Sequence, residues 1–241
     1  MKRLTILGML AAFLVLGVLL VRVWRDEPAP VPVSAPKLDK VYFVPIGTFS
    51  YPSLSELADY YGRTLHLTIE ILSAIEAGRE AMDETRGQFI GEELINLMKQ
   101  RYPQLANDQS VMLIGVTPKD MYIREYTWQF AFAIRDEGRF VVVACYRMNP
   151  EVFGLPLDSK LFHTRIRKII TKNIGMLYFG LPQSTDRKSV LFGPILGLDD
   201  LDSIGEDFGG QTTQVPTRVS VRRTAFDSRE GFIRPEARHP V

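Results

Sequence analysis

The densest group of side chains that could hold a cation is a run of acids around residue 200. Closely spaced carboxylates are the usual ligands of Ca²⁺, but an EF-hand loop also needs Gly at its sixth position and Glu at its twelfth, and this run lacks that spacing. We therefore expect the acids to stabilise the N-terminus of a short helix near Leu201. A hydrolase that uses this cluster is kept as an alternative function. The acids are Asp199, Asp200, Asp202, Glu206 and Asp207.

A thiol nucleophile is the second chemistry to consider, because Cys145 is the only cysteine and His163 could act as its base. Cys145 lies within a run of β-branched residues, where a lone cysteine is usually a small core side chain, and we interpret it so. A single cysteine also excludes an internal disulfide. The histidines, His66, His163 and His239, are far apart in the sequence, so a zinc site of His and Cys would have to gather nearly all of them.

A long helix between these two groups must position any site nearby. We predict it over residues 158–179, with Asp158 as its N-cap and Gly180 at its end. Its basic residues are expected to lie mostly on the side opposite the apolar face. The residues that define the apolar face are Phe162, Ile166, Ile169, Ile170, Ile174 and Leu177. The basic residues are Arg165, Arg167, Lys168 and Lys172.

The end of this helix and the segment after it carry a family resemblance. TKNIGMLYFGLPQSTDRKSVLFG, residues 171–193, resembles the active-site segment of the archaemetzincins, zinc proteases with the pattern H-E-x-x-H-x-x-G-x-x-H-C-x4-C-x-M. In that pattern two His one helical turn apart bind zinc, the Glu polarises a water, and a Gly lets a third His return to the metal.

The register of the resemblance is fixed by placing Gly180 at the Gly of the pattern. A shift of one residue would instead put Lys172, Asn173 and Met176 at the first positions, and neither register supplies a His or a Glu. The resemblance therefore implies a framework without catalytic residues, metal ligands or a cofactor. With Gly180 fixed, the two helix His positions are Asn173 and Leu177, the Glu position is Ile174, the third His position is Gln183, the Cys positions are Ser184 and Ser189, and the Met position is Leu191.

Earlier segments extend the resemblance to residues 40–208. A strand that ends in Gly-Val-Thr, residues 115–117, precedes Asp120, Tyr122 and an aromatic turn over 128–132, as in the family. An Arg-x-Gln-aromatic element over 86–89 also matches, and an Arg-Met pair at 147–148 stands where the family has Arg-Leu. We expect Asp120, Tyr122 and Trp128 to lie beside the former cleft, where they either bind a ligand or peptide or hold the turn together.

The predicted elements suit an α+β or α/β fold, with a zincin-like mixed sheet covered by helices. A helix should begin at Ser53 or Ser55 and run to about Tyr61, and a connection is expected over 82–86. Glu137 and Gly138 should form the turn of a hairpin. The predicted strands cover 41–46, 64–72, 111–116, 129–134 and 139–146, and a further helix covers 89–102.

The two ends of the chain differ from this body. Residues 4–21 are uncharged and mainly apolar, and as a helix they would span about 27 Å, close to a hydrocarbon core of roughly 30 Å. We predict an uncleaved membrane anchor over 1–26, with a cleaved signal peptide as the alternative. A Pro-rich linker follows over 27–39, the zincin-like domain over 40–208, and a disordered basic tail over 209–241.

Together these features predict a single-pass membrane protein whose body lies outside the cytoplasm. We expect a catalytically inactive binding or assembly module with a protein or peptide partner. The alternatives are a hydrolase with a non-standard site and a divergent metalloprotease with unrecognised ligands. The net charge of +1 gives no support for binding nucleic acid.

Overall fold

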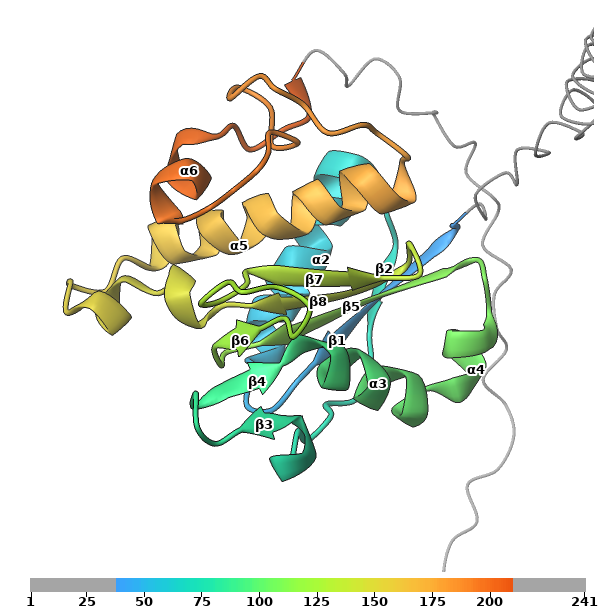
Figure 1. Ribbon diagram of the computed structural model, residues 1–241. Coiled ribbons are helices and arrows are strands. Elements are labelled where there is room, and N and C mark those ends of the chain that lie inside the picture. The colour runs from blue at the N-terminus through green and yellow to red at the C-terminus, as the bar shows by residue number, and fades with distance from the viewer. Residues whose placement is uncertain (1–37, 210–241) are drawn as a thin grey trace, which may run out of the picture.

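The computed structural model describes residues 38–209, which are built around one five-stranded mixed sheet (Figure 1). Four strands run parallel, and the last, β7, is an antiparallel edge strand paired with β8. This confirms the predicted mixed sheet. In spatial order the strands are β2 (Ile69–Ile71), β1 (Lys40–Pro45), β5 (Val111–Thr117), β8 (Phe140–Ala144) and β7 (Ala133–Asp136).

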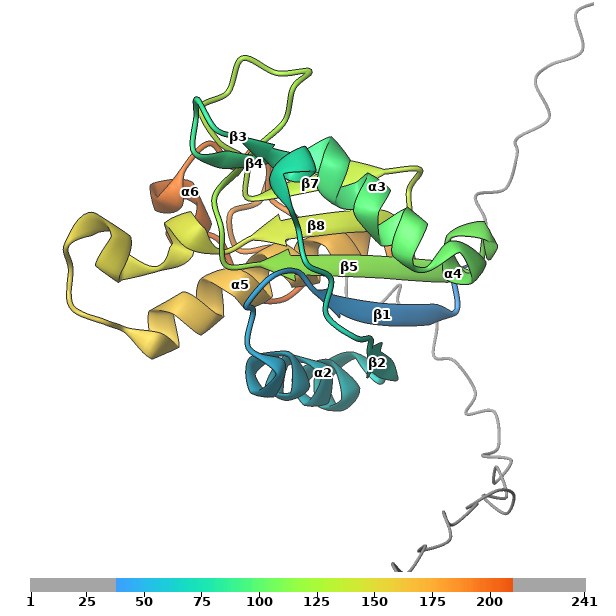
Figure 2. The same ribbon diagram turned by 90° about the horizontal axis from the view of Figure 1, so that it is seen from below.

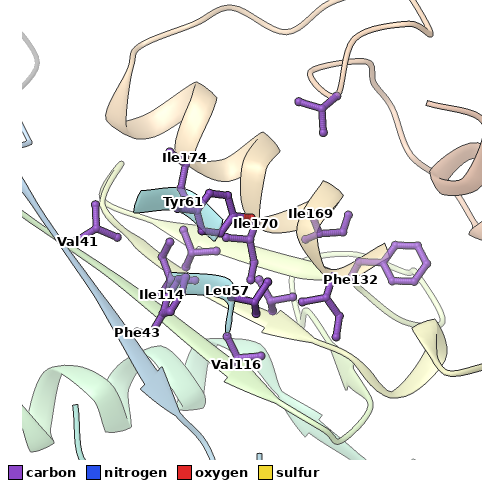
Figure 3. Close-up of a cluster of buried hydrophobic side chains, with 14 of the residues drawn as sticks. Val41, Phe43, Leu57, Tyr61, Ile114, Val116, Phe132, Ile169, Ile170 and Ile174 are labelled. Carbon is purple, nitrogen blue, oxygen red and sulfur yellow. The ribbon is translucent and has the colours of Figure 1, made fainter. Parts of the chain in front are cut away.

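Helices cover both faces of the sheet (Figure 2). α2 (Tyr51–Leu65) and α5 (Ser159–Asn173) lie on one face, and α3 (Gly91–Arg101) with the short α4 (Pro103–Asn107) lies on the other. Side chains of a strand alternate between its faces, so each central strand contributes to two cores. In β5, Ile114 packs toward α2 and α5 (Figure 3).

A second, three-stranded sheet lies next to the main one. It pairs β4 (Gln88–Ile90) with β3 (Met82–Asp83) and with β6 (Met121–Tyr122). Three 3₁₀ turns complete the connections: η1 (Arg79–Ala81), η2 (Tyr146–Met148) and η3 (Pro150–Phe153).

The predictions for residues 64–66 and 89–90 were wrong. α2 continues through Gly62 to Leu65 and ends at His66, which adopts a left-handed backbone with φ of 55°. The strand predicted over 64–72 is therefore reduced to the three residues of β2. Residues 88–90 form β4, because they pair with Asp83 and with β6 before α3 begins at Gly91.

The predicted long helix is present, but its last turn is irregular. Asp158 caps α5 as expected, since its carboxylate accepts a hydrogen bond from Leu161 N at 2.8 Å. After Asn173 the chain forms a π-helical turn, η4 (Ile174–Tyr178), in which Phe179 N donates to Ile174 O at 3.2 Å. A π turn adds one residue to the helical repeat, so the side chains after Asn173 are rotated relative to a regular helix.

The basic residues of α5 lie mostly opposite its apolar face, but three of them do not face solvent. Arg165, Lys168 and Lys172 are each at least nine-tenths buried, because the returning segment with α6 (Leu198–Ser203) covers that side of the helix. The Arg165 guanidinium pairs with Asp202 at 2.6 Å, and Lys168 Nζ donates to two backbone carbonyls of α6 at 3.0 Å.

The predicted anchor, most of the linker and nearly all of the tail lie outside the described residues. Within 38–209, no helix has both the length and the apolar character needed to cross a bilayer.

Candidate functional site

A cleft of about 770 Å³ runs between the edge strand β7, the C-terminal half of α5 and two loops. The loop of residues 123–132 forms one rim, and residues 194–196 form part of the other. Ile169, Lys172 and Asn173 of α5 and Gln183 of the following loop line the floor. The cleft thus lies beside the C-terminal end of α5.

A polar network that is buried at Gln88 and Asp120 holds the rim loop in place. Asp120 accepts from Arg147 Nη2 at 2.8 Å and from Gln88 Nε2 at 2.8 Å. Arg86 Nε donates to Gln88 Oε1 at 2.8 Å, and its Nη2 donates to the carbonyls of Trp128 and Gln129. The motif residues of three separate segments therefore meet, and their contacts fix the backbone of the loop over the cleft.

The three residues predicted beside the cleft have different roles. Asp120 belongs to the network, and Tyr122 donates its hydroxyl to Asp83 Oδ2 at 2.9 Å, so these two support the rim. Trp128 lines the cleft itself and is 52% exposed. Its ring stacks on Tyr126 with centroids 4.2 Å apart, which forms an aromatic surface on the rim.

The floor of the cleft carries two cations and two amides. Asn173 is 1% exposed, donates to Ile169 O at 2.7 Å and accepts from Arg135 Nε of β7 at 2.5 Å. The residue before it, Lys172, donates a hydrogen bond from its Nζ to Phe192 O. A methyl group on Gly193 would lie 2.7 Å from Gln183 Nε2 and 3.0 Å from Lys172 Nζ, so the amide and the ammonium converge at this point.

Burial lowers the pKa values of the two cations, Lys172 and Arg135, and their mutual repulsion lowers that of Lys172 further. Burial, and then the positive charge of Arg135, lower the pKa of Lys172 to about 8. Burial also lowers the pKa of Arg135, although the guanidinium stays protonated at neutral pH. No carboxylate of the described residues forms an ion pair with either group.

The other residues at the predicted positions lie away from the cleft. Ile174 and Leu191 are fully buried in the core, and Leu177 packs against the same core. Of the two predicted helix His positions only Asn173 therefore faces the cleft, because the π turn rotates Leu177 away. Met176 of the alternative register is also absent from the lining, whereas Lys172 of that register is present.

Serines at the two Cys positions stabilise the loop after α5. Ser184 Oγ accepts from Asp186 N at 3.0 Å. Ser189 is buried and donates its hydroxyl to Phe208 O at 3.1 Å.

The floor does not fit the zinc ion that the fold family implies. Asn173 already uses both ends of its amide, Lys172 is a cation, and Gln183 is a poor zinc ligand. Two neighbouring cations would also repel a dication. In residues 38–209 no three His, Cys, Asp or Glu side chains gather as a metal site would require.

The acidic cluster is occupied by ion pairs. Asp202, Glu206 and Asp200 pair with arginines at 2.6, 3.0 and 3.1 Å. Asp199 and Asp200 lie in the first turn of α6, as predicted, and Asp207 accepts from Gly209 N at 2.8 Å. Most of these carboxylates therefore fasten α6 and its flanking loops.

Cys145 and His163 line a separate cavity of about 520 Å³ between α2 and α5. Cys145 is 1% exposed, and burial raises the pKa of its thiol far above the ordinary value. The thiol stays protonated at neutral pH, so Cys145 is a core residue as interpreted from the sequence.

Sequence reasoning did not identify Arg135 as a site residue and did not foresee that Lys172 is buried in the cleft. The one available signal for Lys172 was its place in the shifted register. Arg135 gave no such signal, because it follows the strand predicted over 129–134.

Comparisons with known proteins agree with this architecture. The model of peptidase family M54 matches residues 54–213. The archaemetzincin of Pyrococcus furiosus is 29% identical over 164 residues, which cover 64% of this chain and 80% of that protein. That of Pyrococcus horikoshii is 28% identical over 113 residues, or 46% of this chain and 56% of that protein.

Two solved structures share the fold. A zinc-dependent peptidase from Methanocorpusculum labreanum superposes with a TM-score of 0.60 at 19% identity, and covers 73% of this chain and 99% of its own. The archaemetzincin of Archaeoglobus fulgidus, complexed with malonate, gives a TM-score of 0.58 at 19% identity with the same coverage. The family match spans most of the chain, and on that basis this protein belongs to peptidase family M54.

Proposed function

We propose that this chain is a catalytically inactive, membrane-anchored member of its family that binds an extended peptide as an interaction or assembly module outside the cytoplasm. The observation that carries the proposal is the floor of the cleft. Lys172, Asn173 and Arg135 occupy it with an ammonium, an amide and a guanidinium, and none of these can bind zinc or activate a water there.

The free edge of β7 provides a means of binding a peptide. Ala144 N donates to Phe132 O at 3.0 Å, so the alternation of an antiparallel ladder directs the backbone groups of Ala133 and Arg135 away from β8. Both residues line the cleft. An extended peptide laid along β7 would satisfy these groups by strand addition, with the Trp128 surface above it.

Support for the membrane anchor comes from the sequence alone. Residues 4–21 form an uncharged, mainly apolar run, and residues 22–27 bring charged side chains where a signal cleavage site would need small residues. Placement of the body outside the cytoplasm follows the usual behaviour of a short N-terminal anchor.

The two alternative functions have less support. A hydrolase based on the acidic cluster would need free carboxylates, and three of the five are in ion pairs. A metalloprotease with other ligands would need its histidines together. His66 caps α2, while His163 lines the second cavity, and His239 lies outside the described residues.

Metal analysis and peptidase assays of the purified full-length chain test the loss of catalysis. We expect no stoichiometric zinc and no peptide cleavage that a chelator abolishes. Stoichiometric zinc together with chelator-sensitive cleavage would contradict the proposal.

Site-specific photo-crosslinking in membranes tests peptide or protein binding. A benzoyl-phenylalanine at Trp128 should capture a reproducible partner. The matched control replaces Tyr51, which is 58% exposed on α2 and does not line the cleft. The same products from both positions would show that the cleft is not the binding site.

A further inference from the structure

Two cations line the cleft, the buried Lys172 and the exposed Arg135, and neither pairs with a carboxylate of the described residues. Lys172 is 7% exposed, and an ammonium at this depth is costly unless its charge and its N–H groups are compensated. One of its three N–H groups is bonded to Phe192 O. No acceptor among the described residues bonds the other two.

The Arg135 guanidinium also has N–H groups that bond no described residue. Its Nε donates to Asn173, which fixes the direction of the guanidinium, but its two terminal NH₂ groups bond no described residue. Asn173 is held in turn by Ile169 O at 2.7 Å. These bonds fix the directions of the two cationic side chains before any ligand binds, and each keeps N–H donors that bond no described residue.

None of the carboxylates that line the same cleft pairs with Lys172 or Arg135. Asp136 bonds Lys99 Nζ at 2.6 Å, and Glu92 Oε1 accepts from Arg124 N at 2.9 Å while its Oε2 bonds no described residue. Glu125 is exposed on the rim loop and forms no ion pair with a described residue. A ligand in the cleft can therefore supply the negative charge that Lys172 and Arg135 lack.

We propose that Lys172 and Arg135 bind a carboxylate of the peptide that occupies the cleft. A planar guanidinium and an ammonium with free donors match the two oxygens of a carboxylate, and the bound anion would remove their mutual repulsion. Gln183, whose amide converges on Lys172, can add a further donor. This inference rests on the proposed peptide binding and assigns its anchoring group.

Two sources present the same chemistry: the C-terminal carboxylate of a peptide and the side chain of Asp or Glu. Both reach the floor from a backbone on β7, because Arg135 itself is a residue of that strand. Three peptides of one apolar sequence separate the sources. The first has a free C-terminus, the second a C-terminal amide, and the third a C-terminal amide with one central Glu.

Calorimetric titration of the full-length chain with these peptides tests the assignment. We expect the free acid, the Glu peptide, or both to bind about tenfold more tightly than the neutral amide, since charge-assisted bonds are about twice as strong as neutral ones. Lys172→Gln should reduce the affinity for the charged peptides to that of the amide. The exposed Lys160→Gln on the same helix is the control and should leave all three affinities unchanged.

A small anion gives a readout that does not need peptide binding. Acetate should raise the Tm of the wild type more than acetamide at equal ionic strength, and this difference should disappear in Lys172→Gln. Arg135→Gln, whose side chain is on the surface of an edge strand, provides a second variant if the first does not fold.

The outcomes distinguish the two proposals. Equal binding of all three peptides, unaffected by Lys172→Gln, would overturn the carboxylate assignment and leave peptide binding intact. Failure of every peptide together with a specific acetate effect would overturn peptide binding while supporting the anion site. Failure of both would overturn both.

Discussion

At the scale of single residues, the decisive feature is a lysine in a place where the resemblance expects a metal centre. The Lys172 ammonium is held by Phe192 O and has Arg135 as its charged neighbour. The bond to Phe192 O does not fully compensate the burial of the ammonium, and Arg135 repels it, so its pKa falls to about 8. A pKa lowered in the folded state means that the charged form opposes folding.

Lys172→Met should therefore stabilise the protein in a pH-dependent way. The folded pKa is about 8 and the ordinary value is 10.5, so the unfolded chain binds more protons between them and wild-type stability rises through that range. The variant should be more stable by on the order of 1–2 kcal/mol at neutral pH, after allowance for solvent screening and the lost bond to Phe192 O. Its advantage should shrink as the pH rises from about 8 to 10.5.

Chemical denaturation across this pH range measures the effect. Lys160→Met is the control, because this residue is exposed on the same helix and should show no such trend. A stability difference that stays constant or grows above pH 8 would mean that Lys172 is not the titrating group.

Gly193 is a second residue that bears on the proposed carboxylate site, because it lies beside the side chains of Gln183 and Lys172. An added Cβ would lie 2.7 Å from Gln183 Nε2 and 3.0 Å from Lys172 Nζ. Both atoms end flexible side chains, so Gly193→Ala should displace them at little cost in stability while weakening carboxylate binding severalfold. Gly197→Ala in the same segment meets no atom within 4 Å and should alter neither property, as titration and thermal melts would show.

At the scale of elements, the irregular end of α5 depends on a glycine that the core requires. A Cβ on Gly175 would lie 2.6 Å from the Phe208 ring and 2.8 Å from Leu191 Cδ2. Both neighbours are buried, so they cannot move aside cheaply. The turn η4 therefore packs against the segment that returns over α5 only because this position has no side chain.

Gly175→Ala should destabilise the protein by about 1–3 kcal/mol, the usual cost of overpacking. The matched substitution is Gly62→Ala in α2, where the added Cβ meets only Leu67 O at 3.6 Å. Because glycine is a poor helix former, that variant should gain about 1 kcal/mol. Denaturant melts give the free energy of unfolding of both variants. If the two substitutions changed it in the same direction by similar amounts, Gly175 would not be tightly packed at η4.

Elements with local signals were predictable from the sequence. Asp158 caps α5 through a contact three residues away, and Glu137 and Gly138 form the β7–β8 turn with positive φ at both positions. His66 gave no such signal, because an ordinary side chain adopts the left-handed backbone there. The meeting of Arg135 with Asn173 was equally hidden, since it joins residues 38 apart through tertiary packing and a π turn.

At the scale of the whole molecule, the family fold holds the two sides of the cleft together. The network of Arg86, Gln88, Asp120 and Arg147 joins three segments and holds the rim, while the ion pairs of α6 hold the return segment on α5. These contacts fix the two sides of the cleft. The framework was recognisable because its motifs occur in order, whereas the floor of the cleft depends on side chains outside them.

The remaining prediction concerns the attachment of the chain to a membrane. Residues 4–21 contain no charged side chain, and transfer of such a run into a bilayer is favourable because each apolar residue contributes about −0.3 to −0.6 kcal/mol. The full-length chain should therefore stay in the membrane pellet after alkaline carbonate extraction. A variant that lacks residues 4–21 should move to the soluble fraction and keep the thermal melt of the body.

Mass spectrometry of the membrane-derived protein separates the anchor from a cleaved signal. An uncleaved anchor predicts that the chain retains Met1 or Lys2, whereas a signal peptide predicts an N-terminus beyond Val21. Protease added to spheroplasts should digest the body if it lies outside the cytoplasm. Release of the full-length chain by carbonate would rule out the anchor, because the apolar run would then not hold the protein in the bilayer.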